Sequence, residues 1–240
     1  MNKKVILFDL DGTLLPQNQE EFIGAYFKEL IQKMISLGVP ANNKDEVASI
    51  GKAVWAGTYA MMKNDGTCTN EERLFSTFKA VTGVDISDKK PEFDEFYENE
   101  FQRAGEKCGY NPLVKSTIDR LKMDGYRLAV ATNPLFPLLA NKQRLMWAGV
   151  SLEDFEYCTS YEICSYCKPN LKYYEGVLNH LDVRAEDCLM VGNDVKEDMV
   201  ARELGMDVFL ITDCLINSEN KDIDDYPHGS WKDFIEYISK

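Results

Sequence analysis

Two carboxylates stand at the end of the first strongly apolar segment of the chain. Residues 5–8 are continuously apolar, and Asp9, Asp11 and Gly12 follow almost at once. An uninterrupted apolar run predicts a buried parallel strand, and open α/β sheets bind ligands at the carboxyl ends of such strands. Two carboxylates this close repel each other, which favours a divalent cation or a shared proton between them. Asp-Gly is also ordinary turn chemistry, but a turn leaves the first aspartate unexplained.

Polar groups also follow the second strand-like segment and precede a later helix. Thr132 ends the segment 127–132, and Asn133 follows it directly. A hydroxyl and turn amides at this place can hold a phosphoryl oxygen. Pro169 is expected in the first turn of the next helix. Lys168 then stands just before that helix, free to reach a phosphate or a carboxylate. Each signal is weak alone, because polar strand ends and solvated lysines are common.

A second acidic cluster follows another apolar run, residues 188–191. Gly192 is followed by Asn193 and Asp194, and Asp198 comes four residues later. Two acids four residues apart share a helix face if the helix has begun by then, although Asp194 could equally cap that helix. Magnesium usually takes one or two carboxylates together with a substrate phosphate.

The elements that would position these residues alternate between strand and helix. Apolar runs predict strands at residues 5–8, 127–132, 188–191 and 208–211, and periodicity predicts helices at 112–123, 169–181 and 196–204. This alternation predicts an α/β fold with a parallel sheet and right-handed crossovers.

The region between the first two strands differs from the rest. It shows helical periodicity at residues 20–37, 44–63, 69–80 and about 91–103, and almost no strand pattern. Thr69 and Glu72 form a capping-box pattern at the start of the third of these helices. We therefore expect a core domain of residues 1–15 and 112–240 with an inserted all-helical cap domain of residues 16–111, hinged near 15–17 and 105–112.

Composition disfavours several functions. The 240 residues carry a net charge of −13, which repels nucleic acid and also a phosphorylated substrate, unless a metal or local lysines reverse the field. Seven scattered cysteines, an odd number, are typical of reduced thiols in a cytoplasmic protein. No secretory signal is visible, and prolines interrupt residues 128–141, the nearest candidate for a membrane span. The sequence gives no indication of the oligomeric state.

The motifs, taken in order, resemble those of the haloacid dehalogenase-like (HAD) superfamily. Four segments match in order and in strand context: Asp9-x-Asp11-Gly12-Thr13, Thr132, Lys168, and Gly192-Asn193-Asp194-x-x-x-Asp198. The resemblance covers the whole chain. The four motifs match in the core, whereas the cap matches only as a helical insertion after the first motif. It implies a Rossmann-like core with an inserted helical cap, and a magnesium-dependent phosphatase that hydrolyses a small phosphorylated metabolite.

The resemblance also implies a role for each residue. Asp9 would attack phosphorus and form an aspartyl-phosphate, and Asp11 would protonate the leaving oxygen and then activate the hydrolytic water. The implied phosphate-binding set is Asp9, Gly12, Thr132, Asn133 and Lys168. Of these, the lysine would neutralise the charge of the nucleophile and the phosphate.

The implied magnesium ligands are Asp9, the main-chain carbonyl of Asp11 and an acid of the fourth motif. Family members often have Asp directly after the glycine of that motif, where this chain has Asn193. We expect Asp194 to be the side-chain ligand, with Asn193 and Asp198 in support. Which of these three contacts the metal directly stays open.

Several alternatives remain. Dehalogenases of the superfamily typically lack the second aspartate and need no metal, so Asp11 favours phosphoryl transfer. A phosphonatase would need a cap lysine that the sequence does not single out. A sugar-phosphate mutase shares the same core, and a catalytically inactive binding or regulatory member is a second open alternative. His180 and His228 show no metal-ligand spacing.

The aromatic and methionine side chains of the second cap helix are expected mainly to pack the core of the cap. They are Trp55, Tyr59, Met61 and Met62. Some of them could instead line the substrate side.

The pair Cys164 and Cys167 stands directly before Lys168. An ordinary loop is the simpler interpretation than a zinc site, because no second Cys-x-x-Cys exists to complete the set of zinc ligands. We predict that oxidation of the pair moves Lys168 and lowers activity. Assays of the reduced protein and of the oxidised protein, with the disulfide confirmed by peptide mapping, test this; identical activity would end the hypothesis.

Overall fold

A parallel sheet of six strands organises the described part of the chain, residues 4–239, in this computed structural model. The strand order is β3-β2-β1-β4-β5-β6, and each pair of neighbouring strands in this order is parallel. The strands are β1 Val5–Phe8, β2 Arg127–Val130, β3 Tyr157–Cys158, β4 Cys188–Gly192, β5 Asp207–Ile211 and β6 His228–Gly229. The predicted parallel α/β sheet is confirmed, while the two-residue strands β3 and β6 were not predicted.

Strand β1 lies between β2 and β4 and is buried on both faces. Its four side chains have no exposed surface, which explains why the run is apolar rather than alternating. Phe8, the last residue of β1, pairs with Val130 and with Val191. The loops that follow these three strands therefore emerge side by side at one edge of the sheet.

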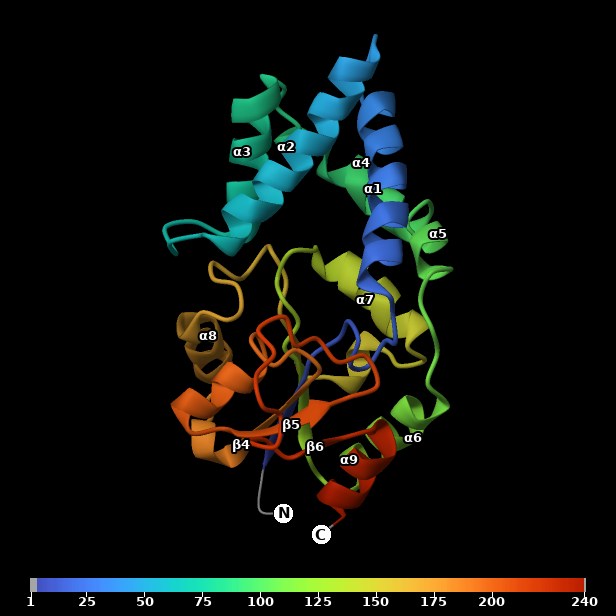
Figure 1. The fold of residues 1–240 in the computed structure, drawn as a ribbon. Helices are drawn as coiled ribbons and strands as arrows, with labels where there is room; N and C mark the ends of the chain where they lie inside the picture. The colour runs from blue at the N-terminus through green and yellow to red at the C-terminus, as the bar shows by residue number, and fades with distance from the viewer. Residues whose placement is uncertain (1–3, 240) are drawn as a thin grey trace.

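Helices cover both faces of the sheet (Figure 1). On one face lie α6 Pro112–Met123, α7 Leu138–Trp147 and α9 Trp231–Ile238, which pack on the side chains of Ile6 and Phe8. On the other face lie α8 Leu171–Leu181 and the 3₁₀ helix η4 Met199–Leu204, against Val5 and Leu7. Helices α7 and α9 were not predicted.

The inserted block between β1 and the core helix α6 is all helical. Its helices are α1 Gln19–Ser36, α2 Lys44–Met62, α3 Asn70–Thr82, the 3₁₀ turn η1 Ser87–Lys89, α4 Lys90–Glu98 and α5 Gln102–Gly105. It stands over the carboxyl edge of the sheet. Helices α1 and α2 lie close together at the end far from the sheet and diverge toward it (Figure 1). A core with an inserted helical cap is thus confirmed, and the boundary at 16–111 stays a prediction.

Helix starts in the cap follow from capping chemistry. Asn18 and Asn43 accept hydrogen bonds from the first free backbone N–H groups of α1 and α2. Thr69 and Glu72 form the predicted capping box of α3. The helix predicted at about 91–103 is instead two helices, because α4 ends at Glu98 and the turn after it brings Phe101 into the core of the cap.

Two expectations near the site were wrong. Pro169 is not in the first turn of α8; it follows a cis peptide bond, and Asn170 caps the helix, which begins at Leu171. The α-helix predicted at residues 196–204 is a run of turns followed by the 3₁₀ helix η4. Side-chain oxygens of Asp194 and Asp198 accept backbone N–H groups there, and such bonds compete with an α-helical ladder.

No helix within residues 4–239 is both long enough and apolar enough to cross a membrane.

Candidate active site

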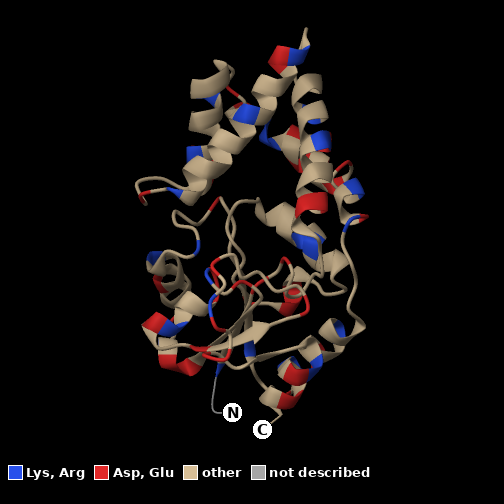
Figure 2. Cartoon of the chain, in the orientation of Figure 1, with Lys and Arg blue, Asp and Glu red and all other residues tan. Residues whose placement is uncertain are grey.

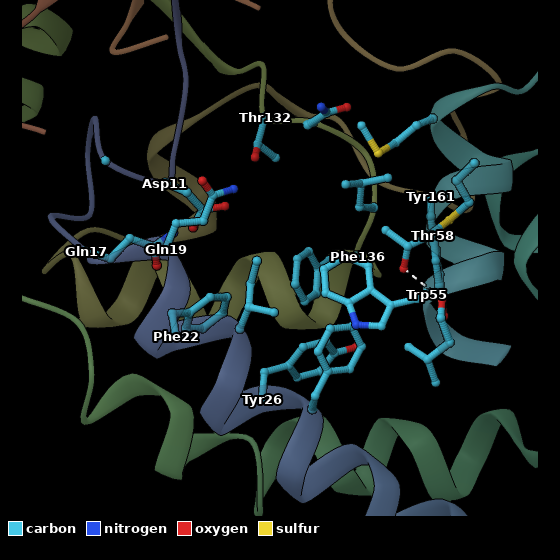
Figure 3. A pocket seen from close by; sticks show the side chains of 18 of the residues that line it. Asp11, Gln17, Gln19, Phe22, Tyr26, Trp55, Thr58, Thr132, Phe136 and Tyr161 are labelled. Atoms are coloured by element: carbon cyan, nitrogen blue, oxygen red, sulfur yellow. Dashed lines mark hydrogen bonds between the residues drawn. The ribbon is translucent and has the colours of Figure 1, made fainter. Parts of the chain in front are cut away.

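A cavity of about 1190 Å³ lies between the carboxyl edge of the sheet and the cap. Most of the predicted site residues line it: Asp9, Asp11, Gly12, Thr132, Asn133, Asn193, Asp194 and Asp198. Figure 3 shows Asp11 and Thr132 facing this space from the core, across from side chains of the cap. The structure thus brings residues from three strand ends into one site.

Lys168 joins two of the predicted aspartates. Its ammonium nitrogen lies 2.9 Å from Asp9 Oδ1 and 2.6 Å from Asp198 Oδ1, and the side chains of Lys168 and Asp198 are almost fully buried. Burial alone would lower the pKa of the lysine, but the two carboxylates outweigh burial and raise its pKa well above its ordinary value. The lysine therefore stays charged beside Asp9.

The second oxygen of Asp9 faces a hydroxyl. Thr13 Oγ1 lies 3.2 Å from Asp9 Oδ2 and 3.0 Å from Asn193 Oδ1, so its proton is shared between two acceptors. The backbone N–H of Asp9 donates to Val191 in the neighbouring strand at 2.9 Å. Asp9 is consequently held from its backbone and from both carboxylate oxygens. The motif contains Thr13, but sequence reasoning gave it no role.

Asp11 pairs with a cation that sequence reasoning missed. The fully buried Arg144 of α7 donates to Asp11 Oδ2 and to Asn141, and its guanidinium carbon lies 4.2 Å from the centroid of the Phe136 ring. Burial raises the pKa of Asp11; Arg144 opposes the rise, and Asp9 adds to it. A carboxyl with a raised pKa is suited to acid catalysis. The sequence could have indicated this partner only through the helix that carries Arg144, and that helix was not predicted.

Glycines allow the close approach of the motif loops. Gly12 has φ +83°, and a Cβ there would lie 2.3 Å from Asn193 Nδ2. A Cβ on Gly192 would lie 2.1 Å from Asp198 Oδ2. Any side chain at either position would therefore displace a residue of the acidic cluster.

The three candidates of the fourth motif have different surroundings. Asn193 accepts from Thr13 and donates to the carbonyl of Cys214 at 2.6 Å, which ties three loops together. Asp194 lines the cavity, and its Oδ1 accepts the N–H groups of Lys196 and Glu197 at 2.7 and 2.9 Å. Asp194 thus makes contacts of the kind that an N-cap residue makes, which was the alternative to its role as a metal ligand.

Asp198 differs from both. Its Oδ1 is bonded to Lys168, and its Oδ2 accepts the N–H of Asp194 at 3.0 Å. Burial raises its pKa although Lys168 opposes the rise.

The segment just after β2 is fixed by hydrogen bonds to its backbone. The main-chain oxygen of Thr132 accepts from Thr159 Oγ1 at 2.6 Å and from the Tyr173 hydroxyl at 2.8 Å. The neighbouring Asn133 donates from Nδ2 to Glu197 Oε2 at 3.0 Å. Sequence reasoning also missed Glu197, which lines the cavity.

Residues 3–205 match the family of haloacid dehalogenase-like hydrolases. The chain belongs to this family. Among its relatives, a glyceraldehyde 3-phosphate phosphatase of Methanocaldococcus jannaschii is 27% identical over 95% of this chain and 91% of its own length. The enzyme of the same name from Methanothermobacter thermautotrophicus is 31% identical, but over only 47% of this chain and 49% of its own length. A phosphoglycolate phosphatase of Vibrio parahaemolyticus is 25% identical over 87% and 83%.

A solved structure supports the fold of the HAD-like chain. A putative HAD-hydrolase from Bacillus subtilis, bound to magnesium, aligns over the whole of both chains with a TM-score of 0.58 and 18% identity. The predicted family and the predicted Rossmann-like core with an inserted helical cap are confirmed.

The donor set of the HAD-like site fits a hard divalent cation. Oxygens of Asp9, Asp11 and Asp194 border the cavity, and Asp11 Oδ1 is buried without a hydrogen-bond partner in the described residues. No three His, Cys, Asp or Glu side chains converge on one point within residues 4–239. Magnesium suits such a site, since it keeps several waters and binds one or two carboxylates plus a substrate phosphate.

The expectation that the aromatic and methionine side chains of α2 mainly pack the cap core is wrong: even the buried Met61 packs with Tyr161 and Cys167 of the core rather than in the cap cluster. Trp55, Tyr59 and Met62 are 52%, 62% and 43% exposed, and only Met61 of the four is buried. Trp55, Met61 and Met62 line the cavity, whereas Tyr59 does not.

The cysteines near Lys168 are free thiols. Burial raises the pKa of Cys164 and raises that of Cys167 to about 12, which disfavours thiolate chemistry at both. A redox effect on Lys168 stays a prediction.

Glu197 provides a test of the electrostatics of the HAD-like site. Burial raises the pKa of Glu197 to about 7, with Lys168 opposing the rise and Asp194 and Asp9 adding to it. The folded state therefore holds a proton that the unfolded chain has lost, and stability falls as pH rises from the ordinary glutamate pKa toward 7.

We predict that Glu197→Gln removes this loss. Its gain in free energy of unfolding over the wild type should grow from under about 1 kcal/mol at pH 5 to roughly 3 kcal/mol at pH 8. Urea unfolding at both pH values, with chelator present, measures it. The exposed Glu186→Gln serves as control, and a gain independent of pH would contradict the assignment.

Proposed function

We propose that this HAD-like hydrolase is a magnesium-dependent phosphatase that acts on a small phosphorylated metabolite through an aspartyl-phosphate. The observation that carries the proposal is the pair of Asp9 and Lys168 at 2.9 Å on the floor of the cavity. A charged lysine beside the carboxylate offsets part of the charge of an approaching phosphate. The phosphatase names of the relatives support hydrolysis over transfer to a second sugar.

Asp9 is the nucleophile in this proposal. Lys168 and Thr13 occupy its two oxygens from the protein side, which fixes the carboxylate in orientation and reduces the entropy cost of reaching phosphorus. Its attack forms a bond between an aspartate oxygen and phosphorus and breaks the bond between phosphorus and the leaving alcohol. A two-step transfer replaces one difficult displacement by two easier ones.

Asp11 carries the proton in both steps. Its raised pKa lets it give a proton to the departing alcohol oxygen. It then takes a proton from the water that attacks the aspartyl-phosphate, which returns both aspartates to their starting states. Arg144, bound to Oδ2, holds the carboxyl in place, and the unbonded Oδ1 is available for the transfer.

The remaining residues hold the phosphoryl group and the metal. Thr132, Asn133 and the turn at Gly12 would supply donors to phosphoryl oxygens. Asp9, the carbonyl of Asp11 and Asp194 would hold magnesium, with Asn193 and Asp198 in support. Bound there, the cation would offset the charge of the phosphoryl group against the acidic floor. The cap of residues 16–111 would close over the substrate.

We predict that Asp9→Asn abolishes turnover of a generic aryl phosphate. The amide cannot form the acyl-phosphate, and losing a covalent nucleophile costs at least about a thousandfold in kcat. Wild-type turnover should also vanish with chelator and return with magnesium. Steady-state assays of the wild type, of Asp9→Asn and of the exposed control Asp88→Asn test this. Activity that survives in Asp9→Asn would refute the proposed nucleophile.

A further inference from the structure

The two ends of the cavity have opposite character. The floor is acidic, whereas the end toward the cap is lined mainly by large apolar side chains, among them Phe22, Tyr26, Trp55, Met62, Leu135 and Phe136. Figure 3 shows Phe22, Tyr26, Trp55 and Phe136 gathered on the side away from Thr132. In Figure 2 red segments lie on several loops beneath the cap, and others lie on α1 and on the outer helices of the core, while much of the ribbon of the cap helices is tan.

Positive charge is absent from the lining. No Lys, Arg or His is among the described residues that border the cavity, which include the acids Asp9, Asp11, Glu20, Asp194, Glu197 and Asp198. The nearby cations Lys168 and Arg144 are already bound to carboxylates of the floor. A carboxylate on the leaving group would therefore be desolvated without a partner and would face like charge, which is unfavourable.

Most hydroxyls at the apolar end are already bonded within the protein. Tyr26 and Tyr97 bond to each other, with their oxygens 3.0 Å apart, and Thr58 donates to the carbonyl of Val54 in its own helix at 3.0 Å. Tyr161, whose hydroxyl makes no hydrogen bond within residues 4–239, could serve one polar atom. The amides Gln17 and Gln19 also line the cavity, but they lie beside Asp11 and away from Trp55 (Figure 3). At the apolar end a leaving group rich in hydroxyls would therefore find few partners, and each unpaired buried hydroxyl costs free energy.

The size of the cavity leads to the same conclusion. At about 1190 Å³ it exceeds the roughly 300–1,000 Å³ of ordinary small-molecule sites. A three-carbon phosphate would leave the cap end empty. Trp55 and Met62 are 52% and 43% exposed along this wall, and an apolar group laid against them would remove that surface from water.

We propose that the leaving group of the substrate is a neutral apolar alcohol, an extended alkyl chain or an aryl ring, seated against the cap. This rests on the phosphatase function proposed above and narrows its substrate class. The reaction is hydrolysis: the bond between phosphorus and the alcohol oxygen breaks, the alcohol leaves with a proton, and water supplies the new oxygen of phosphate.

A series of n-alkyl phosphates from ethyl to octyl tests the proposal on the full chain with magnesium. We expect kcat/KM to rise by about threefold for each added methylene until the apolar end is filled, since each buried CH₂ favours binding by a similar factor. The octyl ester should exceed its counterpart with a terminal carboxylate by at least about tenfold.

The outcomes separate the substrate class from the activity. Hydrolysis with no dependence on chain length, or a higher kcat/KM for phosphoglycolate or glyceraldehyde 3-phosphate than for octyl phosphate, overturns the substrate class and leaves the phosphatase standing. Absence of turnover with every monoester overturns the proposed function and this inference together.

A matched pair of variants on α2 locates the apolar site. Trp55→Ala removes an aromatic side chain that lines the cavity, and Tyr59→Ala removes an even more exposed one from the same helix that does not. Trp55→Ala should lower kcat/KM for octyl phosphate by about tenfold and leave ethyl phosphate nearly unchanged, whereas Tyr59→Ala should change neither. Equal losses on both substrates, or equal behaviour of the two variants, would overturn the placement.

Discussion

The buried ammonium of Lys168, shared by Asp9 and Asp198, is the interaction on which the site depends. Two carboxylates brought together in a buried loop cluster repel each other, and burial penalises the charge of both. Lys168 supplies a compensating cation at 2.9 and 2.6 Å. It joins the loop after β1 to the loop after β4, so the ends of two adjacent strands and the start of α8 are fixed by one side chain. The proposed nucleophile owes its orientation in large part to this contact.

The elements that carry strong local signals could be predicted from the sequence. β1 is apolar at every position because both of its faces are buried, and the helix starts at Asn18, Asn43 and Thr69 follow from capping chemistry. The segment after Gly192 was predicted as α-helix and is not, since acidic side chains take its backbone N–H groups. Helix α7 was missed, and with it Arg144. A buried arginine that pairs with a residue 133 positions away leaves no periodic pattern to detect.

The core and the cap contribute different properties to the site. Motif residues of the core are recognisable in the sequence because phosphoryl transfer requires particular side chains and the fold places them at successive strand ends. The cap contributes shape and polarity, which depend on which faces of α1 and α2 are left without a packing partner. Trp55 shows the difference: its sequence pattern suggested core packing, yet its ring contacts only part of α1, with its centroid 4.8 Å from that of Phe27, and the rest of it borders the cavity. Substrate preference therefore has to be argued from the assembled cavity rather than from a motif.

The covalent intermediate is the most direct test of the account. Full-length protein with magnesium would be mixed with a substrate labelled in its phosphoryl group, quenched in acid within milliseconds, and digested for peptide mapping. The account predicts label on the peptide that contains Asp9, stable in acid and released by hydroxylamine, as an acyl-phosphate should be. Label on any other residue, or turnover of substrate with no labelled protein at any quench time, would contradict nucleophilic catalysis by Asp9.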